Sequence, residues 1–114
     1  MQNKKLIDFV IDKIEDMKGR DIQSLDVSQF SSVTDTMIIC SGNSKRHVKS
    51  IADNVIAESR RAEFEVIGLE GVAESEWVLV DLGDVVLHIM QDSARDFYQL
   101  EKLWAPNHAE SKAG

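Results

Sequence analysis

The chain has one cysteine, one proline and few aromatic residues among its 114 residues. The single cysteine, Cys40, lies in an apolar run at residues 37–40, so no intrachain disulfide can form. A buried thiol in a reducing compartment is the expected arrangement. Spacings typical of metal ligands, such as CxxC, HxxxH and HExxH, are absent from the sequence. We therefore expect neither a metal site nor a cofactor.

Long apolar runs are also missing. No stretch approaches the roughly 18 residues that a membrane-spanning helix needs, and no signal-peptide pattern opens the chain. An apolar content of 43% nevertheless allows one compact core in a chain of this length. We expect a soluble, cytoplasmic protein without membrane contact, with one domain at residues 1–104 and a disordered polar tail at residues 105–114.

Basic residues are scarce in the second half of the chain. Residues 1–62 carry ten Lys or Arg and nine Asp or Glu, whereas residues 63–101 carry ten acids and only Arg95. This second segment, with a net charge of −9, repels phosphate and attracts basic surfaces. The distribution predicts no DNA binding and little or no direct RNA contact, and it suits a basic protein partner. A merely solubilising excess of acid explains the composition equally well.

Hydrophobic spacing predicts the element order α-β-β-α-β-β-β-α. The fold class is therefore α/β, with a mixed five-stranded sheet and flanking helices, and the strand–helix–strand unit at residues 36–69 is expected to form a right-handed parallel crossover. The predicted helices are residues 4–18, a segment that Asn43 or Ser44 caps, and a third segment that Ser93 opens and Pro106 ends. The predicted strands are residues 22–27, 36–41 and 64–69 and the two arms of residues 77–90.

The two arms of residues 77–90 are the most informative part of the chain. They flank Asp81-Leu82-Gly83-Asp84, a predicted turn in which Gly83 adopts positive φ and the carboxylates bond nearby backbone N–H groups. Strand pairing needs neither Trp77 at the foot of this ribbon nor Leu82 at its tip. We interpret the ribbon as a protein-docking surface with an exposed apolar tip. Burial of Trp77 in the core is an equally good interpretation.

The histidines give little indication of catalysis. His88 stands alone in an apolar strand, where a hydrogen-bonded structural role is expected. His47 lies in a basic helical turn and is expected to be solvated, while His108 falls in the tail. Phosphate-binding loops and nucleophile elbows are absent from the sequence.

One enzyme alternative remains. A Ser-Gly-Asn-Ser turn at residues 41–44 precedes a predicted helix, and Glu63 and Glu65 alternate at the start of the next predicted strand. Alternating carboxylates share one face of a strand, as a two-metal nucleotidyl-transfer site requires. Surface glutamates are the far more common meaning of such a pair.

Together these motifs resemble the ribosomal silencing factor family, also called the Iojap or YbeB-like family. The resemblance covers residues 5–104, and the combined set of motifs is far more specific than any one of them. It rests on Leu25-Asp26-Val27, Thr34-Asp35, Ser41-Gly42-x-Ser44-x-Arg46-His47-Val48, Gly68-x-Glu70-Gly71, the ribbon from Trp77 to Val85 with His88 and Met90, and Arg95-x-Phe97-Tyr98-x-Leu100-Glu101-x-Leu103-Trp104.

The resemblance implies a non-enzymatic translation repressor with a nucleotidyltransferase-like α/β fold. Members of the family bind the large ribosomal subunit through large-subunit ribosomal protein fourteen, block joining with the small subunit, and lower protein synthesis when nutrients are scarce. A homodimer of the free chain, formed through the same surface, is a further hypothesis. With this resemblance, the expected partner-binding residues are Trp77, Asp81, Leu82, Gly83, Asp84, Tyr98, Glu101 and Lys102.

Overall fold

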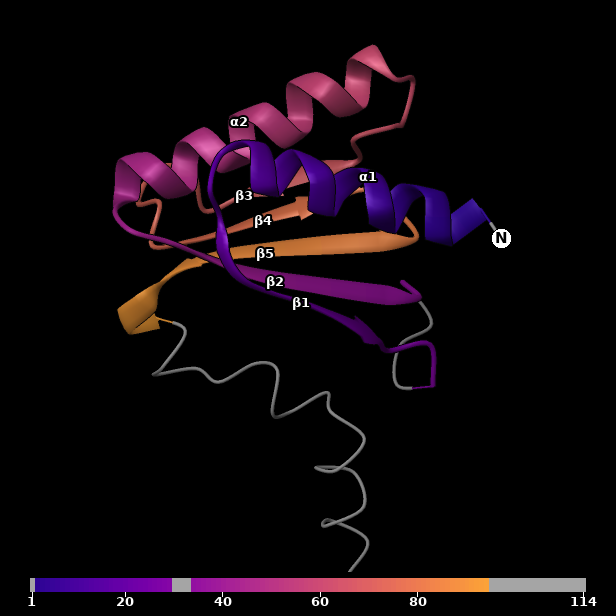
Figure 1. Cartoon of the computed structure of the whole chain (residues 1–114), viewed down its shortest axis with the longest axis horizontal. Coiled ribbons are helices and arrows are strands. Elements are labelled where there is room, and N and C mark those ends of the chain that lie inside the picture. Colours follow the sequence, from indigo (N-terminus) through magenta and orange to yellow (C-terminus); the bar gives the residue numbers. More distant parts are fainter. Residues whose placement is uncertain (1, 30–33, 95–114) are drawn as a thin grey trace, which may run out of the picture.

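A computed structural model describes residues 2–29 and 34–94 of the chain. Two helices lie on one face of a five-stranded sheet (Figure 1). Neither of these helices is long and apolar enough to cross a membrane. The elements are α1 (Gln2–Asp16), β1 (Arg20–Asp26), β2 (Thr36–Gly42), α2 (Lys45–Arg61), β3 (Gly68–Glu70), β4 (Trp77–Asp81) and β5 (Val85–Gln91), after which residues 92–94 are helical.

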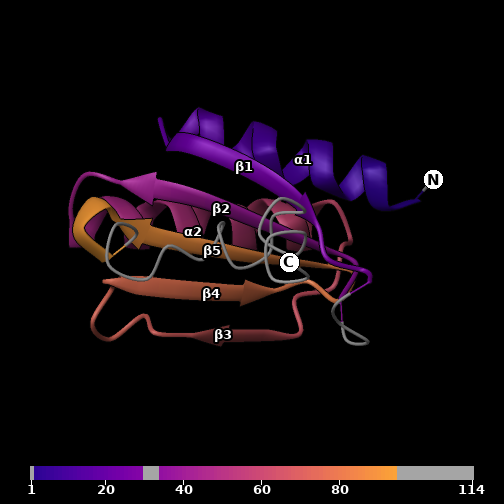
Figure 2. The same cartoon turned by 90° about the horizontal axis from the view of Figure 1, so that it is seen from below.

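The strands follow one another in space in the order β1-β2-β5-β4-β3, as the view onto the sheet shows (Figure 2). Only β2 and β5 pair in parallel; the other neighbours are antiparallel. The predicted mixed sheet of five strands is therefore confirmed. The chain leaves β2 through α2 and re-enters the sheet at its far edge in β3, parallel to β2 but separated from it by β5 and β4.

The middle of the sheet is buried on both faces. Every residue of β2 is buried, because the helices cover one face and a second apolar cluster covers the other. Ile38 and Cys40 face the helices, so the expected burial of the thiol is confirmed. Met37 and Ile39 belong to the second cluster, together with Met90. The stripe of α2 that packs on the sheet comprises Val48, Ile51, Ala52, Val55 and Ile56, at the spacing that predicted the helix.

The strand predicted at residues 64–69 is wrong in its extent, since β3 covers only Gly68–Glu70. The backbone leaves α2 through a turn in which Glu63 has a φ of 68° and the N–H of Phe64 donates to the carbonyl of Ser59 at 2.8 Å. Phe64 and Val66 then pack half-buried against the core. Apolar packing, rather than strand pairing, accounts for the hydrophobic residues at the start of this segment.

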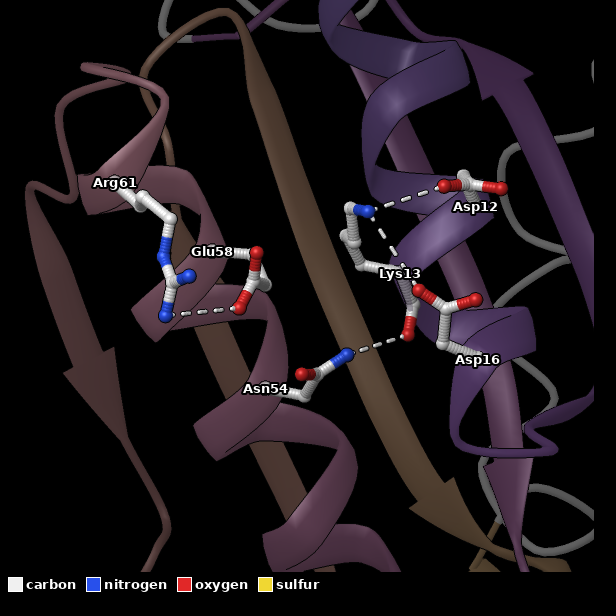
Figure 3. Close-up of polar contacts among 6 residues, drawn as sticks. All are labelled: Asp12, Lys13, Asp16, Asn54, Glu58 and Arg61. Carbon is white, nitrogen blue, oxygen red and sulfur yellow. Dashed lines mark hydrogen bonds and ion pairs between the residues drawn. The ribbon is translucent and has the colours of Figure 1, made fainter.

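Polar side chains of α2 fasten the end of α1. The last carbonyls of an α-helix have no partner within the helix. Asn54 donates to the carbonyl of Lys13 at 2.9 Å (Figure 3). His47 reaches the carbonyl of Met17, with 2.7 Å between Nε2 and the oxygen. The two helices are therefore joined by hydrogen bonds as well as by apolar contact.

The expectation that His47 is solvated is wrong. Its Nδ1 accepts from the backbone N–H of Asn43 at 2.8 Å, so in the neutral ring Nε2 carries the proton that it donates to Met17. Figure 3 also shows ion pairs between Lys13 and the carboxylates of Asp12 and Asp16, which join nearby residues of α1. Such exposed pairs contribute little to stability. They also lie within α1, whereas the hydrogen bonds of His47 and Asn54 run from α2 to the end of α1.

Replacing His47 with Ala should lower the free energy of unfolding by about 1–2 kcal/mol, because the half-buried carbonyl of Met17 loses its donor. Urea unfolding of the two chains measures the difference. The matched control is Lys49→Ala, at an exposed position on the same helix. Equal stability of His47→Ala and the unchanged chain would contradict the proposed fastening role.

Candidate protein-docking surface

The turn between β4 and β5 has the predicted hairpin geometry. β4 ends at Asp81 and β5 begins at Val85, and the two strands pair in antiparallel fashion. Gly83 has a φ of 86°, a conformation that an L side chain rarely adopts, and its N–H donates to Oδ1 of Asp81 at 2.9 Å. The N–H of Leu82 donates to the carbonyl of Val85 at 2.9 Å. The predicted roles of Gly83 and Asp81 in the turn are thereby confirmed.

The expectation that Leu82 forms an exposed apolar tip is wrong. Its side chain is only 6% exposed and belongs to the core beneath the helices. Residues 78, 80 and 82 are every second residue of the chain, and Val78 and Val80 belong to the same core as Leu82. Period-two alternation therefore continues into the first residue of the turn and directs Leu82 inward. This side chain supports the tip from inside.

The exposed apolar residues lie one strand away from the expected position. Ile67 and Leu69 have 59% and 44% of their surfaces exposed, and they are the exposed large hydrophobic residues in the described part of the chain. The N–H of Ile67 donates to the carbonyl of Asp81 at 2.8 Å. A Cβ added to Gly83 would meet Cδ1 of Ile67 at 3.2 Å, which places Ile67 beside the hairpin turn.

We call Ile67, Leu69, Asp81, Gly83 and Asp84, which lie at the β3 edge of the sheet and in the adjoining hairpin turn, the candidate docking surface, or docking surface for short. The sequence analysis proposed its three turn residues as partner-binding and did not propose Ile67 or Leu69. The available signal was alternation: Phe64 and Val66 pack inward, whereas Glu65, Ile67 and Leu69 are exposed. That alternation does not by itself reveal which of the two sets faces the core.

The docking surface belongs to the acidic part of the chain. Residues 62–94 contain eight Asp or Glu and no Lys or Arg. Glu65, Glu70 and Asp84 are exposed, and Asp81 is half-buried. The combination of exposed apolar side chains and exposed carboxylates fits a partner surface that is apolar and basic.

The tip of the hairpin is held to the centre of the sheet. The backbone carbonyl of Asp84 accepts from the N–H groups of Asp35 and Thr36, at 3.2 and 3.1 Å. Thr36 begins β2, whose register with β5 starts at the pair Thr36 and Val85. These bonds fix the backbone that presents the Asp84 side chain.

Trp77 lies at the opposite end of β4, about 13 Å from Asp81 for an extended strand of this length. It is half-buried against the second apolar cluster. Its Nε1–H donates to Nδ1 of His88 at 2.9 Å, and the two ring centroids are 5.8 Å apart. The side chain therefore packs partly against the core and keeps part of its surface exposed.

His88 has the hydrogen-bonded structural role that was predicted. It is 9% exposed, and burial lowers its pKa from 6.5 to about 4, because the apolar surroundings disfavour the charged ring. A neutral ring is also what the Trp77 contact requires, since Nδ1 must keep its lone pair free to accept.

Three of the expected partner-binding residues, Tyr98, Glu101 and Lys102, lie outside the described residues. The third predicted helix lies there as well, apart from the helical residues 92–94. Within that stretch Ala94 packs into the second apolar cluster.

The carboxylate pair of the enzyme alternative does not share a strand face. Glu63 occupies a turn with positive φ, and Glu65 precedes the first residue of β3. Ser44 caps α2 by accepting from the N–H of His47 at 3.1 Å, so helix capping accounts for the turn at residues 41–44. Across residues 2–29 and 34–94 no three His, Cys, Asp or Glu side chains gather into a possible metal site.

Acidification should weaken the fold through His88. An unfolded chain binds a proton at this ring near pH 6.5, whereas the folded chain resists protonation until about pH 4. The stability that depends on neutral His88 is therefore complete above pH 6.5 and is lost as the pH falls from 6.5 toward 4. We expect a loss of about 2 kcal/mol between pH 7 and pH 5, measured by urea unfolding. His88→Leu should remove this part of the pH dependence, and an identical pH profile in the variant would contradict the assignment.

Comparison with known proteins extends over nearly the whole chain. The family described as "Ribosomal silencing factor during starvation" matches residues 1–113. Ribosomal silencing factor RsfS of Haemophilus influenzae is 50% identical over 100 residues, covering 88% of this chain and 98% of that protein. The protein of the same name from Chromobacterium violaceum is 41% identical over 104 residues, covering 91% and 85%.

Solved structures agree with the fold. A crystal structure of a protein from Chromobacterium violaceum superposes with a TM-score of 0.88 at 41% identity, over 91% of this chain and 87% of that one. Another, from Bacillus halodurans, superposes with a TM-score of 0.81 at 35% identity, over 89% and 94%. The matches in sequence and in fold lead to one conclusion: the chain belongs to the ribosomal silencing factor family.

Proposed function

We propose that the chain binds the large ribosomal subunit through large-subunit ribosomal protein fourteen and thereby prevents the small subunit from joining. Translation would fall when nutrients are limiting, in keeping with the starvation named in the family description. A mouse relative is named "Mitochondrial assembly of ribosomal large subunit protein 1". It is 30% identical over 101 residues, and the match covers 86% of this chain and 44% of the mouse protein. Its name supports the large subunit as the partner.

The observation that carries the proposal is the acidic and partly apolar docking surface. Ribosomal proteins are typically basic, and opposite charge raises the rate of encounter and orients the partners. Asp81 and Asp84 would accept hydrogen bonds from Arg or Lys of the partner. Ile67 and Leu69 would supply apolar contact beside Gly83.

The remaining expected contacts extend this surface. Trp77 would present the exposed part of its ring from the other end of β4, while His88 holds its indole N–H. Leu82 acts indirectly in this proposal, by supporting the tip from the core. Tyr98, Glu101 and Lys102 stay proposed partner-binding residues on the strength of the family resemblance alone.

Such a repressor needs no chemical reaction. Occupying the face of the large subunit that meets the small subunit is sufficient to block joining, so we propose a non-enzymatic mechanism in the cytoplasm, where the subunits meet. The bonds from Asp35 and Thr36 to the carbonyl of Asp84 hold the tip in place before binding. A surface ordered in advance loses less conformational entropy when the partner docks.

Sucrose-gradient sedimentation with purified subunits tests the proposal. We expect the chain to migrate with isolated large subunits and not with small subunits. Adding small subunits afterwards should yield fewer joined ribosomes than in its absence. Failure to migrate with large subunits at any salt concentration would overturn the proposed function.

Neutralising the two hairpin carboxylates should weaken this binding. Asp81→Asn keeps an oxygen that can accept from the N–H of Gly83, so the turn should persist in the Asp81→Asn/Asp84→Asn variant. We expect about a tenfold loss of affinity for large subunits at low salt and a smaller loss at high salt, where charges are screened. The matched control, Asp12→Asn/Asp16→Asn on α1, makes the same change in charge. Equal losses in the two variants would argue for a general effect of net charge.

A homodimer of the free chain through the docking surface is a second proposal. Pairing two copies of this surface would bring like charges together, so self-association should be weak at low salt. Raising the salt concentration should strengthen it, which is the opposite of its effect on large-subunit binding. Sedimentation velocity at micromolar concentrations measures both the mass and its salt dependence. A pure monomer at every salt concentration would contradict the dimer.

A further inference from the structure

β3 is the last strand of the sheet. It pairs with β4 on one side, and no described strand follows it on the other. A strand in this position presents backbone N–H and C=O groups that another chain can pair with. The other edge of the sheet is β1, which allows the two edges to be compared.

The two edges differ in how they are protected. β1 has a register shift between Arg20 and Gln23, and Arg20 extends across to Asp92 in an ion pair of 2.7 Å. A bulge and charged side chains are the usual means by which proteins prevent unwanted strand pairing. Residues 64–70 contain neither Lys nor Pro, and the exposed side chains at the β3 edge include Ile67 and Leu69. β3 is short and has acidic residues beside it, but its pairing shows no register shift and it has no basic residue, which distinguishes it from β1.

We propose that the β3 edge accepts an extended, basic segment of the partner protein as a sixth strand. This inference rests on the proposed function and specifies how the docking surface recognises its partner. Main-chain hydrogen bonds along β3 would provide affinity, and the apolar side chains Ile67 and Leu69 would pack against alternate residues of the added strand.

The acidic residues around β3 favour a basic segment as the added strand. Glu65 and Glu70 flank the exposed apolar residues, and Asp84 lies in the adjoining turn. A second copy of β3 would place acidic residues opposite acidic residues, which is destabilising in paired strands. A segment carrying Lys or Arg would place opposite charges there instead. Gly68, between the two apolar residues, has no side chain to obstruct the approach of another backbone.

Amide hydrogen exchange of the chain, free and bound to purified large subunits, tests this inference. In the complex, exchange within residues 68–71 should slow by at least about tenfold, because main-chain bonds form there. Amides of β1 at residues 22–26 serve as the internal control and should be unchanged. Binding without protection of residues 68–71 would overturn the added strand and leave the proposed function intact. Absence of binding would overturn both.

A pair of variants separates edge pairing from loss of fold. Ile67→Lys/Leu69→Lys puts the usual protecting residue on the β3 edge at two exposed positions, so melting temperature should change little. Affinity for large subunits should fall by about tenfold or more. Gln23→Lys/Ser24→Lys makes the same change in charge at exposed positions of β1 and should bind nearly as the unchanged chain does. Equal affinities for the two variants would overturn the inference.

Discussion

The parallel pairing of β2 with β5 is the constraint on which the rest of the structure depends. β2 is buried along its whole length, so its backbone groups need partners on both sides and its side chains need cover on both faces. β5 and β1 supply the hydrogen bonds, and α1 and α2 cover one face. The contact between Asp84 and the start of β2 sets the hairpin against this pair, so the position of the docking surface follows from the centre of the sheet.

The same arrangement accounts for the exposure of the candidate site. Since β5 occupies the place beside β2, the chain emerging from α2 enters the sheet beyond β4, at an edge. Ile67 and Leu69 therefore end beside the hairpin turn, among carboxylates and with no described strand outside them. An enzyme of similar fold would need carboxylates on one strand face at this point of the chain. Here Glu63 lies in a turn with left-handed backbone and Glu65 precedes the first residue of β3, so neither carboxylate belongs to a strand.

Much of this arrangement was predictable from local pattern. The spacing of Val48, Ile51 and Val55 defined α2, and the apolar arms around Gly83 defined the β4–β5 hairpin. His88 was recognisable as a structural residue because an isolated histidine in an apolar strand needs a hydrogen-bond partner. The identity of that partner, Trp77, was not predictable, since it depends on the β4–β5 register. Leu82 was misplaced because turn residues are usually exposed, whereas strand alternation here persists by one residue.

By itself, the sequence determined the element types, the acidic second half of the chain, the hairpin turn and the family, because each depends on neighbouring residues or on motifs read in order. Tertiary structure decided which apolar residues are exposed, since burial depends on what packs against a segment from elsewhere in the chain. It also decided that His47 of α2 bonds to the carbonyl of Met17, just after α1, although the two residues are 30 positions apart. The edge position of β3 was decided in the same way, because the order of strands in a sheet is fixed by long-range pairing and not by any local pattern.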